Sequence, residues 1–147
     1  MLSFREAPVI LEIWKNLTRR PEVLLVDGQG IAHPRGLGLA AHLGLLLDIP
    51  TIGVAKTRLL GEGEEPGSRA GAATSLRWQG QTVGWILRTR SGIKPLYVSP
   101  GHRVSLADCR EIVLGCVRGY RIPEPLRRAD RLSRQKRSDS QAQEGVE

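Results

Sequence analysis

The 147-residue sequence predicts an α/β domain in which helices flank a central sheet, and three features carry this prediction. A continuous apolar run at residues 22–27 ends in Asp27, and a second short apolar run occupies residues 51–54. Between them, residues 37–47 are apolar almost all round, as in a helix that packs tightly on a sheet. Strand, helix and strand with short connections form a parallel βαβ unit with a right-handed crossover.

The elements on either side of this unit follow from simpler patterns. A helix is expected over residues 5–18, residues 61–73 are expected to form an exposed loop, and a short strand is expected at residues 93–99. Two alternating runs flank Gly80 and Gln81, a pair that suits a two-residue hairpin turn. The apolar stripe of the N-terminal helix consists of Val9, Ile10, Ile13, Trp14 and Leu17.

A second helix is expected to begin after Ser105, because Asp108 three residues later completes a pattern that resembles a capping box. Gly119 is expected to end this helix. Cys109 and Cys116 lie on its apolar face, and seven helical residues span roughly 10 Å, which is too far for a disulfide. Both cysteines are therefore predicted to be thiols of the core rather than metal ligands.

The C-terminal part is strongly basic, in a chain whose formal net charge is +7. A short helix is expected to run to about Arg134, and residues 135–147 are expected to form a disordered basic and polar tail behind one domain over residues 1–134. This concentration of basic residues suits the binding of nucleic acid, because phosphate contacts release counterions. A basic tail that is solvated and has no specific partner explains the same composition equally well. The residues expected to bind nucleic acid are Arg127, Arg128 and Arg131.

The chain is expected to be cytoplasmic and to have no membrane partner. No apolar run reaches the ~18 residues that cross a bilayer. Arg5 and Glu6 interrupt the N-terminal apolar residues, and no signal-peptide cleavage site follows.

Polar residues follow both strands of the predicted βαβ unit. Asp27 ends the first strand, Lys56 follows the second, and His33 lies in the glycine-rich loop between them. Ligands gather beyond the carboxyl ends of parallel strands, so we expect these side chains to share one edge. A carboxylate can bind Mg²⁺, a lysine can neutralise phosphate charge, and a histidine can move a proton. The group therefore points to cleavage of phosphodiester bonds.

Each of these residues also has a structural interpretation. An aspartate before a glycine is often a turn former, His33 beside Pro34 could brace its loop, and Lys56 could be a solvated strand end. Glu6 near the start of a helix favourably meets the helix dipole. Its functional alternative is a second metal oxygen, which requires that helix start to face the strand ends.

Four runs carry a resemblance to a known family. They are SFREAPVILE, VDGQGIAHPRGLGLAAHLGLLLDIPTIGVAKTRL, LRTRSGIKPLYVSPGHRVSL and YRIPEPLRRAD. In this order they resemble endonuclease V, the deoxyinosine-specific endonuclease, over nearly all of residues 2–130. The resemblance implies a ribonuclease-H-like fold, with a mixed central sheet that is flanked by helices and incomplete at the N-terminus. It implies a monomeric hydrolase of DNA repair that depends on Mg²⁺, which Mn²⁺ can replace.

The implied reaction is a nick at the second phosphodiester bond 3′ to deoxyinosine in DNA, and some members accept inosine in RNA. Glu6 of SFRE and Asp27 of VDG match metal-binding carboxylates, and Asp130 of RRAD matches a third active-site position that holds histidine or aspartate. His33 of AHPRG and Lys56 of VAK match the other polar active-site residues. The positions that line the pocket for the unstacked base are Gly28, Leu39 and Leu2.

Family members carry a further N-terminal segment with a strand hairpin, the first catalytic aspartate and a Tyr-Pro-Gly wedge loop. The chain thus corresponds to roughly the C-terminal two-thirds of the family domain. Without that segment the strand at 22–27 is left with an open edge, the metal site lacks a ligand, and nothing opens the duplex. We expect the chain alone to fold poorly and to cleave weakly or not at all. Two alternatives stay open, a nucleic-acid-binding module that does not cut and an inactive remnant.

Overall fold

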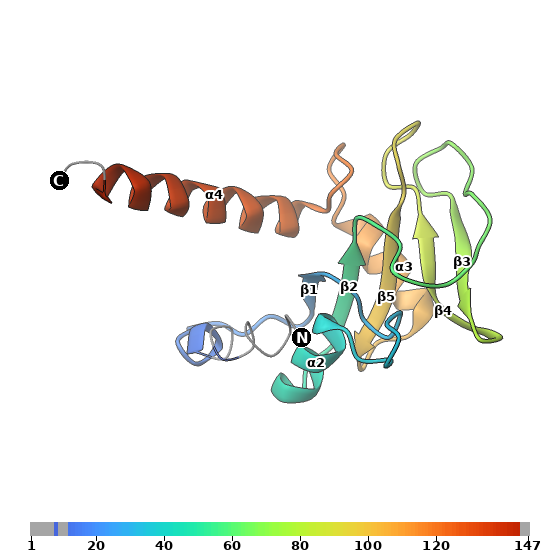
Figure 1. The fold of residues 1–147 in the computed structure, drawn as a ribbon, viewed down its shortest axis with the longest axis horizontal. Helices are drawn as coiled ribbons and strands as arrows, with labels where there is room; N and C mark the ends of the chain where they lie inside the picture. Colours follow the sequence, from blue (N-terminus) through green and yellow to red (C-terminus); the bar gives the residue numbers. More distant parts are fainter. Residues whose placement is uncertain (1–7, 9–11, 145–147) are drawn as a thin grey trace.

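The structure, a computed structural model, describes residue 8 and residues 12–144 and contains a five-stranded mixed sheet between helices (Figure 1). The strand order is β1-β2-β5-β4-β3, in which β1 and β2 are parallel and the other neighbours are antiparallel. This arrangement confirms the predicted α/β class. The elements are β1 (Leu24–Asp27), α2 (Leu39–Leu47), β2 (Thr51–Ala55), β3 (Ala73–Trp78), β4 (Gln81–Leu87), β5 (Leu96–His102), α3 (Leu106–Gly115) and α4 (Glu124–Glu144).

The βαβ unit forms as predicted from β1, α2 and β2, with Asp27 paired to Val54 at the carboxyl ends of the two strands. Helix α2 is not buried all round, because Leu45 and Leu46 are 60% and 49% exposed. Only the side that faces the sheet is covered, since α2 lies on the surface of the molecule. Among the described residues, β1 is the end of the strand order and pairs with β2 alone.

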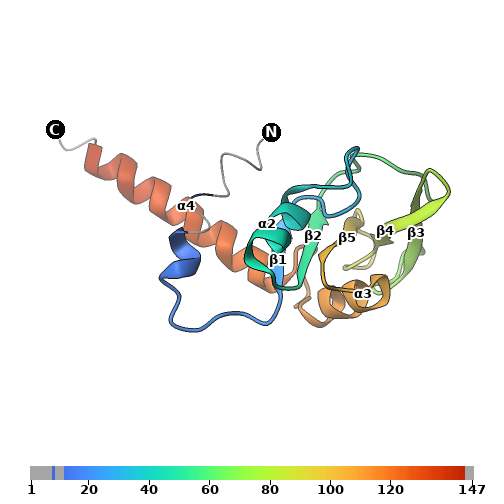
Figure 2. The same cartoon turned by 90° about the horizontal axis from the view of Figure 1, so that it is seen from below.

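The core lies on both faces of the sheet, with α2 on one side and α3 on the other (Figure 2). On the α3 side, Cys109 and Val113 pack against Ile52, Leu87 and Val98. Burial of such side chains stabilises the fold by about 1.5–3 kcal/mol each. On the α2 side, Val26, Ala40 and Leu43 form a smaller cluster.

The loop after β1 continues the α2 layer across the sheet toward β4. The backbone N–H of Gly30 donates to Ser99 Oγ at 2.8 Å, and that of Ile31 donates to the Pro100 carbonyl at 2.8 Å. This close approach needs a glycine in β2, because a Cβ at Gly53 would collide with the backbone of Gly30. Ala32 is buried against Leu76, Val83 and Ile86 of the hairpin.

The structure corrects the expected turn of the hairpin and the start of the strand that follows it. The two-residue turn is Gln79-Gly80 and not Gly80-Gln81, because both turn residues have positive φ, 51° and 78°, as a type I′ turn requires. The strand expected at 93–99 is β5, which begins only at Leu96. The preceding carbonyls accept hydrogen bonds from arginine side chains, Ile93 from Arg88 and both Lys94 and Pro95 from Arg121.

Helix α3 begins as predicted, since Ser105 Oγ accepts a hydrogen bond from the Asp108 N–H at 3.1 Å. It ends at Gly115 rather than at Gly119. Cys109 is buried and Cys116 is half-buried, and neither forms a disulfide. Burial raises the pKa of the Cys109 thiol to about 12.

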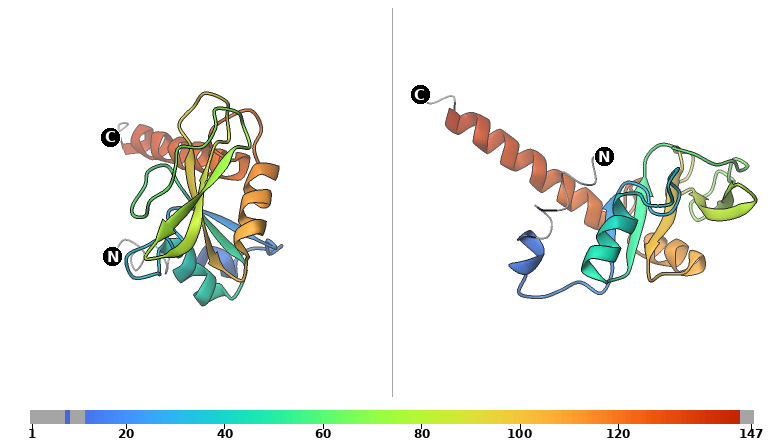
Figure 3. Two further views of the ribbon diagram at one scale, coloured as in Figure 1. Left: turned by 90° about the vertical axis from the view of Figure 1, so that its right-hand side faces the viewer. Right: turned by 60° about the horizontal axis from the view of Figure 1, so that its bottom comes forward.

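The two terminal helices also differ from expectation. Residues 12–15 are helical, but only Trp14 of the expected stripe is buried there, while Ile13 and Leu17 are exposed and Val9 and Ile10 lie outside the described residues. Helix α4 does not end near 134 but continues to Glu144, and it projects away from the sheet (Figures 1 and 3). The division into a domain over 1–134 and a tail over 135–147 stays a prediction. In the described part of the chain, no helix has the length and apolar character that crossing a membrane requires.

Candidate active site

Two of the predicted residues meet at the carboxyl ends of β1 and β2. Because these strands run parallel and in register, Asp27 and Lys56 emerge side by side, and Lys56 Nζ lies 3.5 Å from Asp27 Oδ2. Both side chains reach solvent, at 61% and 49% exposure. The pair is therefore open to a ligand, and water screens the attraction between its charges.

Asp130 joins this pair from the first turns of α4. Asp27, Lys56 and Asp130 line one small cavity of about 60 Å³, whose apolar wall includes Ile122 and Leu126. Asp130 Oδ2 also lies 3.1 Å from the guanidinium of Arg134, one turn further along α4. Each carboxylate of the cavity thus lies within ion-pair distance of a cationic side chain, and Arg127 also lines the cavity.

Arg121 holds this edge of the sheet together, and the sequence patterns gave no indication of it. One guanidinium nitrogen donates to the carbonyl of Lys56 at 2.8 Å and to that of Pro95 at 2.9 Å, while Nε donates to the carbonyl of Lys94 at 2.9 Å. The end of β2 and the residues before β5 are therefore fixed against the segment that leads into α4. A single arginine between Gly119 and Pro123 carries no pattern that would have marked it.

His33 does not join this group, in contrast to the expectation of one shared edge. It lines a separate cavity of about 380 Å³ with Trp78 and Gln81, because its loop crosses the sheet toward the hairpin. The ring Nδ1 accepts the backbone N–H of Arg35 at 3.2 Å, which is the loop-bracing contact that the structural interpretation foresaw. In the neutral ring this contact leaves the proton on Nε2.

Two of the three predicted base-pocket positions lie together. Gly28 follows Asp27 with a φ of 155°, and a Cβ built on it would lie 3.7 Å from the Cβ of Leu39 at the start of α2. Gly28 thus presents bare backbone beside the apolar side chain of Leu39, and it directly follows Asp27 in the sequence. Leu2 and Glu6 lie outside the described residues.

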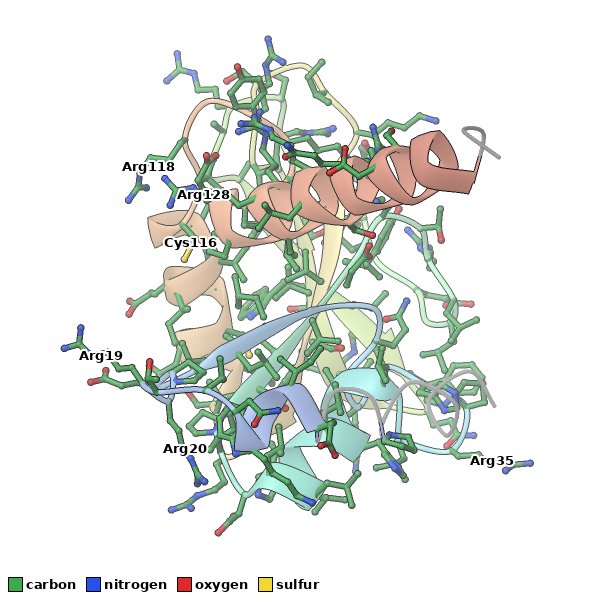
Figure 4. All side chains as sticks on the ribbon, turned by 90° about the vertical axis from the view of Figure 1, so that its left-hand side faces the viewer. Arg19, Arg20, Arg35, Cys116, Arg118 and Arg128 are labelled. Atoms are coloured by element: carbon green, nitrogen blue, oxygen red, sulfur yellow. The ribbon has the colours of Figure 1, made fainter. Side chains whose placement is uncertain are left out.

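The three predicted arginines do not share one face. Arg127 and Arg131 line a cavity together with Asp130, whereas Arg128 lies beside Arg118 and Cys116 at the opposite edge of the molecule from Arg35 (Figure 4). Arg127 lies over the Tyr120 ring at 3.6 Å and donates to Glu124 at 2.7 Å. This hydrogen bond, together with the charges of Arg127 and Arg128, lowers the pKa of the Glu124 carboxyl.

The donor set at the cavity fits a hard divalent cation, because carboxylate oxygens are the ligands that Mg²⁺ prefers. Asp27 and Asp130 supply two carboxylates from different elements. Within residues 12–144, no three or more histidine, cysteine, aspartate or glutamate side chains come close enough together to hold a metal ion. Glu6, the other carboxylate that the resemblance assigns to the metal, lies outside the described residues.

Comparisons with known proteins agree on one family. The family model for endonuclease V matches residues 1–131. The endonuclease V of Nostoc punctiforme is 53% identical over 132 residues, which cover 90% of this chain and 60% of that protein. The crystal structure of endonuclease V from Streptomyces avermitilis superposes with a TM-score of 0.89 at 45% identity and covers 95% of this chain and 61% of that one.

A third relative carries nucleic acid. Ciona intestinalis endonuclease V, in complex with a 23-mer DNA containing an inosine followed by a ribo-adenosine, superposes with a TM-score of 0.79 at 30% identity. The match covers 92% of this chain and 64% of that one. The chain spans 60% or less of the length of the curated relatives from Nostoc and Gloeobacter.

Proposed function

The chain belongs to the endonuclease V family, and from this premise we propose that it acts as a metal-dependent endodeoxyribonuclease of DNA repair. Its substrate is DNA that contains deoxyinosine, and it nicks the second phosphodiester bond 3′ to that base. The observation that carries this proposal is the cavity in which Asp27, Lys56 and Asp130 meet. The inosine-containing DNA bound to the Ciona relative supports the substrate.

The roles of the charged residues follow from their chemistry. Asp27 and Glu6 would hold Mg²⁺, for which Mn²⁺ could substitute, and Asp130 lines the same cavity as Asp27. When bound there, such an ion would supply Lewis-acid chemistry to the phosphodiester. Lys56, 3.5 Å from Asp27, presents an ammonium group that can also neutralise a phosphate oxygen.

The remaining predicted residues contact the nucleic acid. Gly28 and Leu39, with Leu2, receive the unstacked base, which needs bare backbone and an apolar wall close to the carboxylates. Arg127, Arg128 and Arg131 hold phosphates. His33 lines a cavity that is separate from the Asp27 cavity. It takes part in the reaction by contacting a nucleic-acid strand that is long enough to reach both cavities.

A nicking assay with Mg²⁺ on a duplex that contains one deoxyinosine tests this function, with the undamaged duplex as control. Asp27→Ala is expected to abolish cleavage while the affinity for the duplex stays nearly unchanged, because a metal ligand acts on the reaction more than on binding. Cleavage by Asp27→Ala at the wild-type rate would refute the assignment. The same assay with inosine-containing RNA and with Mn²⁺ tests the wider substrate and metal range.

One observation favours a second candidate, a nucleic-acid-binding module that does not cut. The described residues supply only two carboxylates to the cavity, and each has a cationic neighbour. A wild-type chain that binds the duplex but does not nick it, with either metal ion, would decide for this candidate. The monomeric state and the cytoplasmic location stay predictions.

A further inference from the structure

The three tryptophans of the chain differ in what covers their rings. Trp14 is buried, with the guanidinium of Arg20 5.4 Å from its ring centre. Trp85 is half-buried, donates from Nε1 to the Leu106 carbonyl at 2.7 Å, and has the guanidinium of Arg110 5.4 Å from its ring centre. Trp78 is 38% exposed, and among the described residues no arginine or lysine stacks on its ring.

The hairpin holds Trp78 in this place by its backbone geometry. Trp78 is the last residue of β3 and pairs with Gln81 across the type I′ turn. The pairing register between β3 and β4 shifts just before it, since Leu76 pairs with Gly84 and Arg77 with Thr82, which leaves Val83 of β4 as the extra residue. A bulge increases the local twist of a strand pair. Leu76 before it is buried, whereas Trp78 after it reaches the surface.

Trp78 forms one wall of the cavity that His33 also lines. The loop after β1 passes beside the turn end of the β3–β4 hairpin (Figure 3), and the cavity of about 380 Å³ lies between them. This volume is within the range of about 300–1,000 Å³ that is usual for small-ligand sites. Its wall combines an aromatic ring with the polar side chains of Gln79, Gln81 and His33.

The charged residues around Trp78 indicate the sign of the charge that a ligand in this cavity would carry. No carboxylate is among the described residues that line it, and Arg35, between the lining residues Pro34 and Gly36, projects into solvent from the same loop (Figure 4). A different hollow on the hairpin, also bordered by Trp78, is lined by Glu62 and Glu64 together with Arg77. An anionic ligand is therefore favoured on the His33 side.

We propose that this cavity is a nucleotide-binding site in which one unpaired base of a nucleic-acid strand stacks on Trp78. The Nε2–H of His33 and the side-chain amide of Gln81 donate hydrogen bonds to the base edge or to its phosphate. Aromatic stacking suits such a site because every base has a π face. The ligand class rests on the proposed function, but the site is separate from the Asp27 cavity and involves no cleavage.

Binding of a short oligothymidylate to the full chain tests this site without any nicking step. The emission of the wild-type protein is expected to be quenched on binding, and a Trp14→Phe variant is expected to be quenched to the same extent. An oligomer of the same length without bases, which keeps the phosphates, is expected to bind without quenching. Affinity is measured separately through the anisotropy of a labelled oligothymidylate.

Trp78→Leu is expected to weaken binding roughly 5- to 100-fold, the loss of one stacked base, and Trp78→Phe is expected to retain most of the affinity because its ring still stacks. Leu45→Ala, at an apolar position on α2 that is more exposed than Trp78, is the control. The site is refuted if Trp78→Leu binds like the wild type, if the base-free oligomer quenches equally, or if no quenching occurs. A protein that fails to nick but shows these effects refutes the proposed reaction and leaves this site standing.

Discussion

At the scale of single residues, the ion pair between Asp27 and Lys56 is expected to matter little for the stability of the fold and much for the nicking activity. Both side chains are about half-exposed, and exposed ion pairs contribute about 0–1 kcal/mol. Lys56→Gln is therefore expected to change the free energy of unfolding by less than about 1 kcal/mol. Nicking of the deoxyinosine duplex is expected to fall by about tenfold or more, because a charge that faces the phosphate is lost.

Urea unfolding and the nicking rate, measured on the same preparation, give the two effects of Lys56→Gln. Lys15→Gln is the control, since Lys15 is exposed and lies outside the cavity. A large loss of stability with an unchanged nicking rate would make Lys56 a structural residue at the end of its strand.

The two cysteines are expected to differ in reactivity. Burial raises the pKa of Cys109 to about 12, whereas Cys116 is half-buried and borders a hollow with Arg118 and Arg128. The thiolate is the reactive form, so a thiol reagent at mildly alkaline pH should modify Cys116 in the folded protein and Cys109 only after unfolding. Peptide mass spectrometry identifies the modified site. Rapid modification of Cys109 in a folded Cys116→Ser variant would contradict the buried placement of Cys109.

The candidate site was predictable from the sequence only where a local rule applies. Asp27 and Lys56 follow neighbouring parallel strands, and such strands end at the same edge of a sheet. Asp130 comes from a helix far along the chain, and only the family resemblance pointed to it. His33 was expected beside Asp27, but its loop turns across the sheet, and nothing in a glycine-rich loop sequence encodes that direction.

At the scale of elements, the junction between α3 and α4 depends on Arg121. Its planar guanidinium donates to three carbonyls at once, a fork that an ammonium group cannot reproduce. Arg121→Lys is expected to lower the free energy of unfolding by about 1–2 kcal/mol. It is also expected to slow nicking, because Lys56 and the start of α4 lose their common anchor.

Urea unfolding and the nicking rate measure both effects of Arg121→Lys. Arg118→Lys is the matched control, because the side chain of Arg118 donates, among the described residues, only to the nearby carbonyls of Gly115 and Val117. A destabilised Arg121→Lys protein that nicks at the wild-type rate would show that the anchor serves folding alone.

The elements themselves were predictable in kind, while their limits were not. The βαβ unit and the capped start of α3 follow from periodicity and from Ser105. The hairpin turn lies one residue earlier than expected, because Gln79 and Gly80 are the two residues with the positive φ that this turn requires. The strand expected at 93–99 begins later, because arginine side chains bind the carbonyls of Ile93 and Lys94. Helix α4 exceeds its expected length because its last turns follow helix propensity without a glycine or proline to stop them.

At the scale of the whole molecule, the strand order β1-β2-β5-β4-β3 is a property of pairing between distant segments. Hydrophobic periodicity predicts that a strand exists but not which strand lies beside it. The family resemblance implied the mixed sheet that the pairing shows. It also implied an open edge beside the first strand, and β1 is the end of the sheet among the described residues.

The distribution of positive charge leads to a prediction about the whole molecule. Affinity for DNA falls with salt, so the slope of log K against log salt concentration is negative, and its magnitude decreases by about 0.9 for each phosphate contact that is lost. Arg128 and Arg131 are both exposed on α4, the helix that carries Asp130, where Arg131 lines a cavity with Asp130 and Arg128 borders a different one. An Arg128→Gln, Arg131→Gln double variant is therefore expected to bind an undamaged duplex with a slope about one to two smaller in magnitude than the wild type.

Salt titration of duplex binding measures this slope. Arg90→Gln, which removes an exposed charge from the loop after β4, is expected to leave the slope unchanged. If both variants lowered the magnitude of the slope by the same amount for each charge removed, the basic residues would act through the net charge of the chain. If only the α4 variant does so, duplex phosphates lie along α4, because counterion release counts contacts rather than total charge. The helix that carries Asp130 then also sets the register of the strand at the Asp27 cavity.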